Sequence, residues 1–322
     1  MRKVIAFILC LMIICGAFAG CGGTAENNGK IKIVTTIFPI YDWVKEIVGD
    51  TDSTELSMLL DNGVDLHSFQ PTADDIVSIS TCDMFIYVGG ESDEWVTDAL
   101  KEATNKNLVA VNLLDVLGDS VKEEEVKEGM EAEEEEEEGG EEEPEYDEHV
   151  WLSVKNAKVL CQYILKQLCK IDSDNQKNYK SNTAAYTAEL DKLDNKYSTA
   201  VNSADVKTLL FGDRFPFRYL VDDYNLDYYA AFVGCSAESE ASFKTIAFLA
   251  KKVDELNLKS ICKIESSDGK IAQTIKDNTK EKNQEIITFD SMQSTTSKQI
   301  KDGTTYLSVM QNNLNALKNA LK

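Results

Sequence analysis

From Asn175 to Val201 the chain reads NQKNYKSNTAAYTAELDKLDNKYSTAV, a stretch almost free of helix-breaking residues. Apolar and aromatic side chains recur along it, mostly at intervals of three or four positions, at Tyr179, Ala184, Tyr186, Leu190, Leu193 and Tyr197. This spacing places them on one face of a helix, about 40 Å long at a rise of about 1.5 Å per residue. We therefore predict one long helix over 175–203, stiff enough to limit movement between the parts of the chain that it joins.

Strands and helices alternate on both sides of this helix. Before it, the apolar patterns predict strands at 31–37, 54–60 and 84–88, with helices at 40–48 and 72–79. After it, they predict strands at 208–211, 227–232, 260–264 and 285–289, with helices at 217–225, 243–257, 272–280 and 304–321. Such alternation indicates mostly parallel sheets, which bind ligands at the carboxyl ends of their strands. We predict an α/β fold with an N-terminal lobe over 31–174 and a C-terminal lobe over 204–322, joined by the long helix.

The first residues have the layout of a bacterial secretory signal. Arg2 and Lys3 precede an apolar run from Val4 to Phe18, and Ala-Gly-Cys follows at 19–21, as at a lipoprotein cleavage site. The run is shorter than the roughly 20 residues that a membrane-spanning helix needs. We expect a signal peptide over 1–20, a lipid on Cys21 and a flexible tether over 21–30, with the body outside the cytoplasm and anchored to the cell membrane. A cleaved signal without a lipid is the alternative.

The cysteines that follow position 21 are Cys82, Cys161, Cys169, Cys235 and Cys262. Their number is odd, and no Cys-x-x-Cys pair occurs. Cys161 and Cys169 are too far apart along a helix, at about 12 Å, to form a disulfide. We interpret most of the cysteines as small buried apolar residues and expect none of them to bind a metal.

The formal net charge of −23 is concentrated in one segment. Between Glu123 and Glu148 there are 17 acidic residues and one lysine, a net of −16, which leaves −7 for the rest of the chain. We expect a disordered acidic loop at about 122–145, and we expect no nucleic-acid binding because no basic face is visible. The loop is either a tolerated insertion or a polyanion that raises the local cation concentration beside His149.

The chain has only two histidines, and each lies beside carboxylates. His67 occurs in GVDLHSFQP at 63–71, and His149 occurs in YDEHVWLS at 146–153. His67 also follows the second predicted strand, at the sheet edge where ligands bind. One hypothesis is that both imidazoles hold one metal ion, and the alternative is that they are ordinary surface or capping residues.

The signal ending at Cys21, the two histidine motifs and the long helix resemble the solute-binding lipoproteins of zinc and manganese ABC importers. The resemblance runs from about Lys32 to Lys322. That family usually has Pro-His in the first motif and Asp-Pro-His-x-Trp-Leu-Asp-Pro in the second. Here Leu66 replaces the first proline, and Ser-Val at 153–154 replaces the last Asp-Pro. The resemblance implies that His67 and His149 are metal ligands.

The resemblance also implies a third ligand, usually His and sometimes Glu, in the loop after the first strand of the second lobe. The matching stretch, FGDRFPFRYL at 211–220, has no histidine. Alignment on Tyr219 puts Arg214 at the ligand position, and a guanidinium has no lone pair to offer. We therefore predict Asp213 as the third ligand, with a helix N-cap as its alternative role.

The family's fourth ligand is an Asp after the last strand, which Asp290 matches. Glu265 lies in a segment that resembles one near the family's pocket, and we predict it to be an outer carboxylate or an alternative ligand. Two imidazoles and two carboxylates suit tetrahedral Zn(II), whereas bidentate carboxylates would let Mn(II) reach higher coordination. Because affinity generally rises from Mn(II) toward Zn(II), such a site would bind zinc more tightly in vitro whatever it carries in the cell. Zinc is our first choice and Mn(II) the alternative.

The resemblance implies a monomer that captures the metal between its lobes and delivers it to an ABC permease driven by an ATPase on another chain. We expect no enzyme activity. The chain has no phosphate-binding Gly-x-x-x-x-Gly-Lys motif, and a zinc hydrolase would need an open metal position that four protein ligands would close. A surface adhesin or scaffold, with a role in cell adhesion, is the other alternative.

Overall fold

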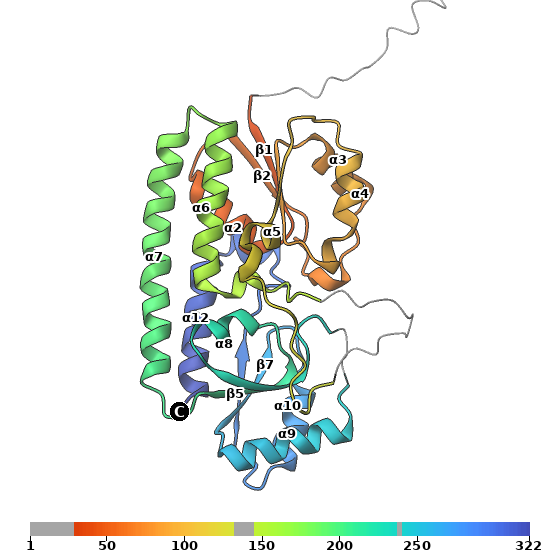
Figure 1. The fold of residues 1–322 in the computed structure, drawn as a ribbon, viewed down its shortest axis with the longest axis vertical. Helices are drawn as coiled ribbons and strands as arrows, with labels where there is room; N and C mark the ends of the chain where they lie inside the picture. Colours follow the sequence, from red (N-terminus) through yellow and green to blue (C-terminus); the bar gives the residue numbers. More distant parts are fainter. Residues whose placement is uncertain (1–28, 132–144, 237–239) are drawn as a thin grey trace, which may run out of the picture. The chain divides into compact units, whose positions relative to one another are not determined.

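The computed structural model describes residues 29–131, 145–236 and 240–322 (Figure 1). Within it, Ile31–Lys322 forms one compact unit. The predicted signal peptide, Cys21 and most of the tether lie outside the described residues, as does the acidic run over 132–144. In the described ranges, no helix combines the length and the apolar character that crossing a membrane requires.

The first lobe is built on a parallel sheet of four strands in the order β2-β1-β3-β4. Its strands are β1 (Ile31–Thr35), β2 (Thr54–Met58), β3 (Met84–Tyr87) and β4 (Val109–Asn112). The helices of this lobe are α2 (Phe38–Val48), α3 (Ala73–Thr81), α4 (Trp95–Lys101) and α5 (Leu113–Leu117). The three predicted strands are confirmed, and β4 is an addition that the sequence interpretation missed.

The second lobe repeats the design, with a parallel sheet in the order β6-β5-β7-β8. Its strands are β5 (Thr208–Arg214), β6 (Asp227–Phe232), β7 (Ser260–Ile264) and β8 (Glu285–Phe289). Its helices are α8 (Arg218–Asp223), α9 (Phe243–Leu256), α10 (Lys270–Asn278), α11 (Ser297–Lys301) and α12 (Tyr306–Ala320). The strand predicted at 208–211 continues to Arg214, with a register shift after Phe211. Asp213 therefore lies within a strand and does not cap a helix, which corrects that alternative.

Two long helices lie beside the sheets. The predicted linking helix is confirmed as α7 (Gln176–Asn202), which Figure 1 shows running alongside both halves of the molecule. It packs against α6 (Val154–Ile171), an 18-residue helix that the sequence interpretation missed. The Ser153 side chain caps α6 by accepting the N–H of Asn156 at 2.9 Å. The start of α6 thus fixes the chain directly after the second histidine motif.

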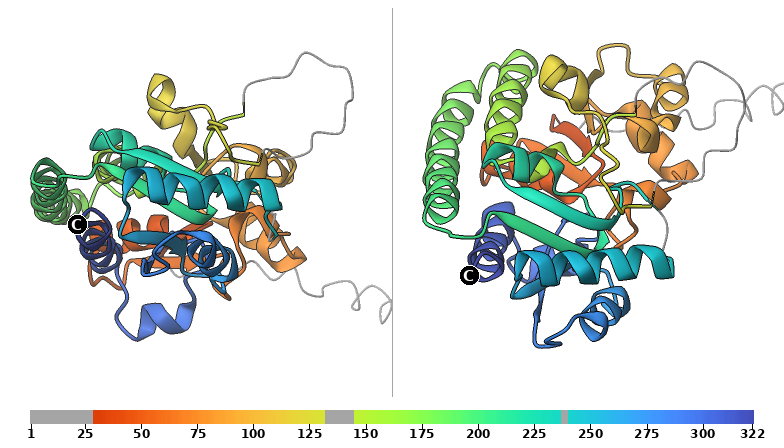
Figure 2. Two further views of the ribbon diagram at one scale, coloured as in Figure 1. Left: turned by 90° about the horizontal axis from the view of Figure 1, so that it is seen from below. Right: turned by 60° about the horizontal axis from the view of Figure 1, so that its bottom comes forward.

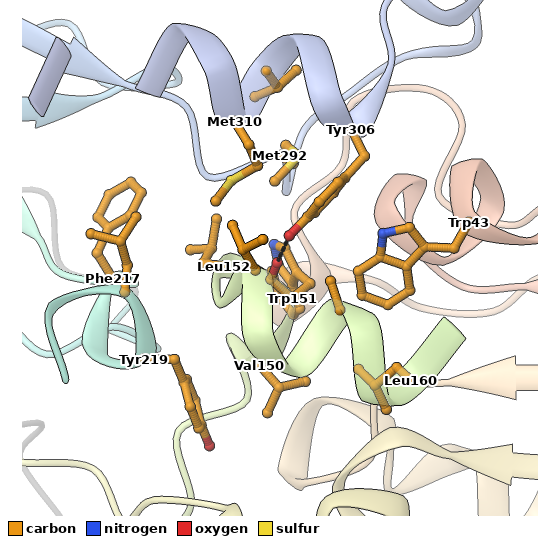
Figure 3. Packing of buried hydrophobic residues seen from close by; sticks show 14 of the residues in the cluster. Trp43, Val150, Trp151, Leu152, Leu160, Phe217, Tyr219, Met292, Tyr306 and Met310 are labelled. Carbon is orange, nitrogen blue, oxygen red and sulfur yellow. Dashed lines mark hydrogen bonds between the residues drawn. The ribbon is translucent and has the colours of Figure 1, made fainter. Parts of the chain in front are cut away.

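A continuous hydrophobic core joins the lobes, in addition to α7. Figure 3 shows Trp151, which follows His149, beside Tyr306 of α12, with Trp43 of α2 facing the tyrosine ring. The Tyr306 hydroxyl donates to the Trp151 carbonyl at 2.7 Å, and Trp151 Nε1 donates to the Ser291 carbonyl of the second lobe at 2.8 Å. The helix α12 also packs against α7 (Figure 2). Opening the lobes as rigid bodies would expose this apolar contact to water, which disfavours a wide hinge motion.

The first part of the predicted disordered loop packs on the body, so the prediction is wrong for 122–131. Glu124 N–H donates to the Glu145 carbonyl at 2.9 Å, and Asp147 N–H donates to the Lys122 carbonyl at 2.9 Å. Further along, Glu131 N–H donates to the Ala231 carbonyl of β6 at 2.9 Å. This segment, which we call the acidic stem (122–131), therefore runs from the first lobe to the edge of the second sheet.

Candidate metal site

His67 follows β2 and lies in a short 3-10 turn, η1 (Leu66–Ser68). The Asp65 carboxylate caps this turn by accepting the N–H of His67 at 3.1 Å. His67 Nδ1 lies 2.7 Å from the Ser92 hydroxyl oxygen and 3.6 Å from Glu148 Oε2. When Nδ1 carries the ring proton and donates it to one of these oxygens, Nε2 presents its lone pair. Leu66, which stands where the family has proline, is buried in the core.

His149 is fully buried just before a second 3-10 turn, η4 (Val150–Leu152). One oxygen of Asp147, Oδ1, accepts both from the backbone N–H of His149 at 2.8 Å and from its Nδ1 at 3.0 Å. The Tyr219 hydroxyl in turn donates to the Asp147 carbonyl at 2.7 Å. This carboxylate fixes the tautomer and the ring orientation of His149, as outer partners of metal-binding imidazoles commonly do.

The two imidazoles face one another across the junction of their loops. The Nε2 atoms of His67 and His149 lie 3.2 Å apart, and the ring centroids are separated by 5.2 Å. Burial, and next the neighbouring His149, lower the pKa of His67 to about 3. His67 is therefore neutral at physiological pH, and one of its two ring nitrogens carries a lone pair that a cation can bind.

Cys235, in the loop after β6, completes the cluster. Its Sγ and one nitrogen of each histidine all lie within 4.8 Å of one another, and within the described ranges these three residues form the group of His, Cys, Asp and Glu side chains that could hold a metal ion. Cys235 thus lies beside the two imidazoles, although from the sequence we expected no cysteine to take part in metal binding. Its place at the carboxyl end of a parallel strand was the signal that could have indicated it.

The loop of Cys235 approaches His149 very closely. A Cβ atom added to Gly234 would lie 3.1 Å from His149 Cε1 and 2.9 Å from the Phe215 carbonyl oxygen. The backbone N–H of Cys235 donates to Glu124 Oε1 of the acidic stem at 3.0 Å. Burial, followed by the charge of Glu124, raises the pKa of the Cys235 thiol, so the thiol is protonated in the metal-free protein.

The predicted carboxylate ligands make backbone hydrogen bonds and do not belong to this cluster. Asp213 Oδ2 accepts from the N–H of Ile264 at 3.2 Å, which ties β5 to β7. Asp290 Oδ1 accepts from the N–H of Met292 at 2.8 Å, which shapes the loop after β8. The ligand roles of Asp213 and Asp290 stay predictions.

Glu265 supports the loop after β8. Its two oxygens accept from the Ser291 N–H at 2.7 Å and from the Ser291 hydroxyl at 2.8 Å. Burial, and secondarily the charge of Asp290, raise the pKa of Glu265. The same loop carries Gln293, whose Nε2 lies 3.4 Å from His67 Nε2. Glu265 thus holds the loop that carries Gln293, and its role as an outer carboxylate or alternative ligand stays a prediction.

Arg214 occupies the position where the resemblance implies a third ligand, and it connects three loops. Its guanidinium pairs with Asp65, the residue that caps the His67 turn. The same group donates to Gln293 Oε1 at 3.0 Å and to the Ser236 carbonyl at 3.4 Å. Arg214 therefore ties the His67 turn of the first lobe to the loops after β6 and β8 of the second.

Comparisons with known proteins agree on one family. The family model described as "ZnuA: Zinc-uptake complex component A periplasmic" matches residues 33–320. The high-affinity zinc uptake system protein ZnuA of Bacillus subtilis is 33% identical over 321 residues, covering 99% of this chain and 96% of that protein. The zinc-binding protein AdcA of Streptococcus pyogenes serotype M3 is 32% identical over 295 residues, 90% of this chain. This chain spans 56% of the length of AdcA.

Solved structures show the same fold. The metal-dependent lipoprotein YcdH from Bacillus subtilis superposes with a TM-score of 0.73 at 29% identity, covering 91% of this chain and 100% of that one. The Zn(II)-bound ZnuA-like domain of Streptococcus pneumoniae AdcA gives a TM-score of 0.71 at 28% identity, covering 91% of this chain and 99% of that one. With its paired histidine loops, its two parallel sheets and a family match over residues 33–320, this chain belongs to the ZnuA family of zinc-uptake components.

Proposed function

We propose that this protein captures Zn(II) as cargo outside the cytoplasm and delivers it to an ABC permease and its ATPase on other chains. The observation that carries the proposal is the pair of Nε2 atoms, which lie 3.2 Å apart and face one another. A cation between them accepts a lone pair from each ring once neither Nε2 carries a proton. The printed names of the relatives, a zinc uptake system protein and a zinc-binding protein, support zinc as that cation.

The spacing of the two nitrogens suits a tetrahedral metal. With Zn–N bonds of about 2.0–2.1 Å, two nitrogen ligands of a tetrahedral ion lie about 3.3 Å apart. The separation of 3.2 Å between His67 and His149 therefore needs almost no adjustment to accept zinc. Mn(II) prefers oxygen donors, and neither Asp213 nor Asp290 belongs to the cluster around the imidazoles. Mn(II) remains the alternative cargo.

The proposal includes attachment to the membrane through a lipid on Cys21. It rests on the signal-like segment that precedes this cysteine. It also agrees with a relative from Streptococcus pneumoniae, which is named a zinc-binding lipoprotein. Cys21→Ala should move the protein from the membrane fraction into the soluble fraction, and an unchanged distribution would refute lipidation at this position.

The role is one of binding and transfer, and the family is that of an uptake component, not of an enzyme. The orienting carboxylate of Asp147 serves this role because it holds His149 ready for the ion without a change of rotamer. Cargo release then requires movement of one of the loops around the site, since the lobes share a core.

The test is calorimetric titration of the chelator-stripped mature chain, residues 21–322 with Cys21→Ala, using Zn(II) and Mn(II) separately. One tight zinc site per chain is expected, with weaker Mn(II) binding. His67→Ala and His149→Ala should each abolish tight binding, because each removes one of the facing nitrogens. Lys101→Ala, at a side chain that is 66% exposed on α4, is the control. Tight binding retained by either histidine variant would refute the assignment.

A further inference from the structure

We propose that Cys235 is a third protein ligand, bound as a thiolate, and that it makes the site selective for thiophilic divalent cations over Mn(II). This inference rests on the proposed function, since it concerns the same site. On coordination the Sγ–H bond is replaced by an Sγ–metal bond, and the proton leaves to solvent. The cargo class then comprises Zn(II), with Cd(II) and Co(II) as chemical analogues that share its preference for nitrogen and sulfur.

The geometry needs only a small movement of the sulfur. In a tetrahedral site with Zn–N of about 2.0–2.1 Å and Zn–S of about 2.3 Å, the nitrogen and sulfur ligands lie about 3.6 Å apart. Cys235 Sγ is already within 4.8 Å of a nitrogen of each histidine. An approach of about 1 Å or less, from a side-chain rotation with a slight shift of the loop, closes the remaining gap.

The backbone on both sides of Cys235 is held in place. Before it, Gly234 packs so tightly on His149 that an added Cβ would lie 3.2 Å from His149 Nδ1. At Cys235 itself, Glu124 accepts the backbone N–H at 3.0 Å. After it, the Ser236 carbonyl accepts from Arg214 at 3.4 Å. These three contacts come from three different segments, so the sulfur has a defined position beside the imidazoles.

The surroundings of Cys235 differ from those of an ordinary core cysteine. Cys161 and Cys262 are buried within the hydrophobic core, where apolar side chains surround them. Cys235, by contrast, is only partly buried, and its surroundings include the carboxylates of Glu124, Asp147 and Glu148. These negative charges favour a cation beside the sulfur, and a bound cation in turn stabilises the thiolate.

Arg214, at the end of β5, contributes no donor to the site, because a guanidinium cannot coordinate a metal. Cys235 supplies a donor from the loop after β6, the strand that lies beside β5 in the sheet. Arg214 meanwhile holds Asp65 and Gln293, and it thereby positions the His67 turn.

Cobalt reports directly on the sulfur, because a thiolate bound to Co(II) gives an intense charge-transfer band in the near ultraviolet. Three proteins are loaded with Co(II): the mature chain with Cys21→Ala, and the same chain with Cys235→Ser or Cys169→Ser added. Cys169 is a partly buried cysteine on α6, so Cys169→Ser is the matched control. The band is expected in the parent and in Cys169→Ser and is expected to vanish in Cys235→Ser. A band that persists in Cys235→Ser overturns the proposal.

Affinity provides the selectivity test on the same variants. Cys235→Ser should lower the affinity for Zn(II) more than about tenfold, because loss of even an outer partner of a ligand has an effect of at least that size. The affinity for Cd(II) should fall more than the affinity for Zn(II). Mn(II) affinity should change less than about twofold, because a hydroxyl suits that ion as well as a thiol does. Zn(II) and Cd(II) affinities within about twofold of the parent would overturn the proposal.

A second measurement avoids substitution of Cys235 altogether. Iodoacetamide alkylates the folded chain, and the rate at each cysteine is followed at the peptide level. Zn(II) should slow the alkylation of Cys235 at least about tenfold and leave the rate at Cys169 unaffected. Equal rates at Cys235 with and without Zn(II) would overturn the proposal even if Cys235→Ser does not fold. Loss of binding in the histidine variants together with unaltered binding in Cys235→Ser would refute this inference and leave the proposed function standing.

Discussion

Substitution of Gly234 by alanine should weaken metal binding in addition to lowering stability. The added Cβ would meet the Phe215 carbonyl oxygen at 2.9 Å and His149 Cε1 at 3.1 Å, whereas unstrained contacts between carbon atoms lie at about 3.5–4.0 Å. The Phe215 carbonyl, directly after β5, belongs to the backbone, so the imidazole must give way by several tenths of an ångström. That movement lengthens the 3.0 Å hydrogen bond between His149 Nδ1 and Asp147.

Two magnitudes follow for Gly234→Ala. Overpacking of this kind costs about 1–3 kcal/mol of unfolding free energy. Loss of the orienting partner of a ligating imidazole typically weakens metal binding about 10–100-fold. The first is measured by urea unfolding of the metal-free protein, and the second by competition for zinc against a fluorescent chelator.

Gly49→Ala serves as the control because it also strains the backbone but lies away from the histidines. Gly49 has a φ of 70°, and its added Cβ would meet Asn182 Nδ2 at 2.7 Å. This variant should lose about 1–3 kcal/mol of stability and keep the parent's zinc affinity. If Gly234→Ala were destabilised yet bound zinc within twofold of the parent, the argument that His149 must be held in this orientation would be wrong.

Three further predictions follow from the core and from the acidic segment. Tyr306→Phe removes the 2.7 Å bond to the Trp151 carbonyl between the lobes, and urea unfolding should show a loss of about 1 kcal/mol without a change in zinc affinity; an unchanged midpoint would contradict it. Burial raises the pKa of Asp42 to about 6, above its unfolded value near 3.8, so its charging destabilises the fold as the pH rises from about 4 to 6. Asp42→Asn keeps an acceptor for the Tyr306 N–H and should remove up to about 3 kcal/mol of this loss in the free energy of unfolding. Urea unfolding across this pH range measures it, and the same pH dependence in the parent and the variant would contradict the prediction. Deletion of 132–143 should slow zinc capture at low ionic strength and leave the equilibrium affinity unaltered, as stopped-flow mixing at two salt concentrations would show; a weakened affinity with an unchanged rate would exclude the steering role.

Much of the architecture was predictable from local patterns. The strands of both sheets and the helix α7 follow from the spacing of apolar residues, because that spacing decides which face of an element can be buried. The helix α6 carries the same kind of signal, with Ala157, Leu160, Cys161 and Ile164 buried on one face, and it was predictable although it was missed. The strand β4, Val109–Asn112, is the exception: it is as short as β3, but only Val111 is buried, whereas three of the four residues of β3 are buried.

The candidate site was predictable only in part. The two histidine motifs identified His67 and His149, because the carboxyl ends of parallel strands bring such loops together. Asp213 was predicted as a ligand because the resemblance places a ligand in this stretch and Arg214 has no lone pair to offer. The structure places Asp213 in β5, which continues to Arg214, and there its side chain accepts a hydrogen bond from β7. No local pattern distinguishes a carboxylate that binds a metal from one that accepts a backbone N–H.

The sequence by itself determined the alternation of strands and helices, the long connecting helix and the two imidazoles, since these depend on residue type and short-range spacing. Only the tertiary structure decided that Cys235 lies beside those imidazoles, that the acidic stem reaches this cysteine through Glu124, and that Arg214 ties three loops together. These contacts join residues that are far apart in the chain. The order of strands in each sheet and the shared core of the lobes set such distances, and no periodicity along the sequence encodes them.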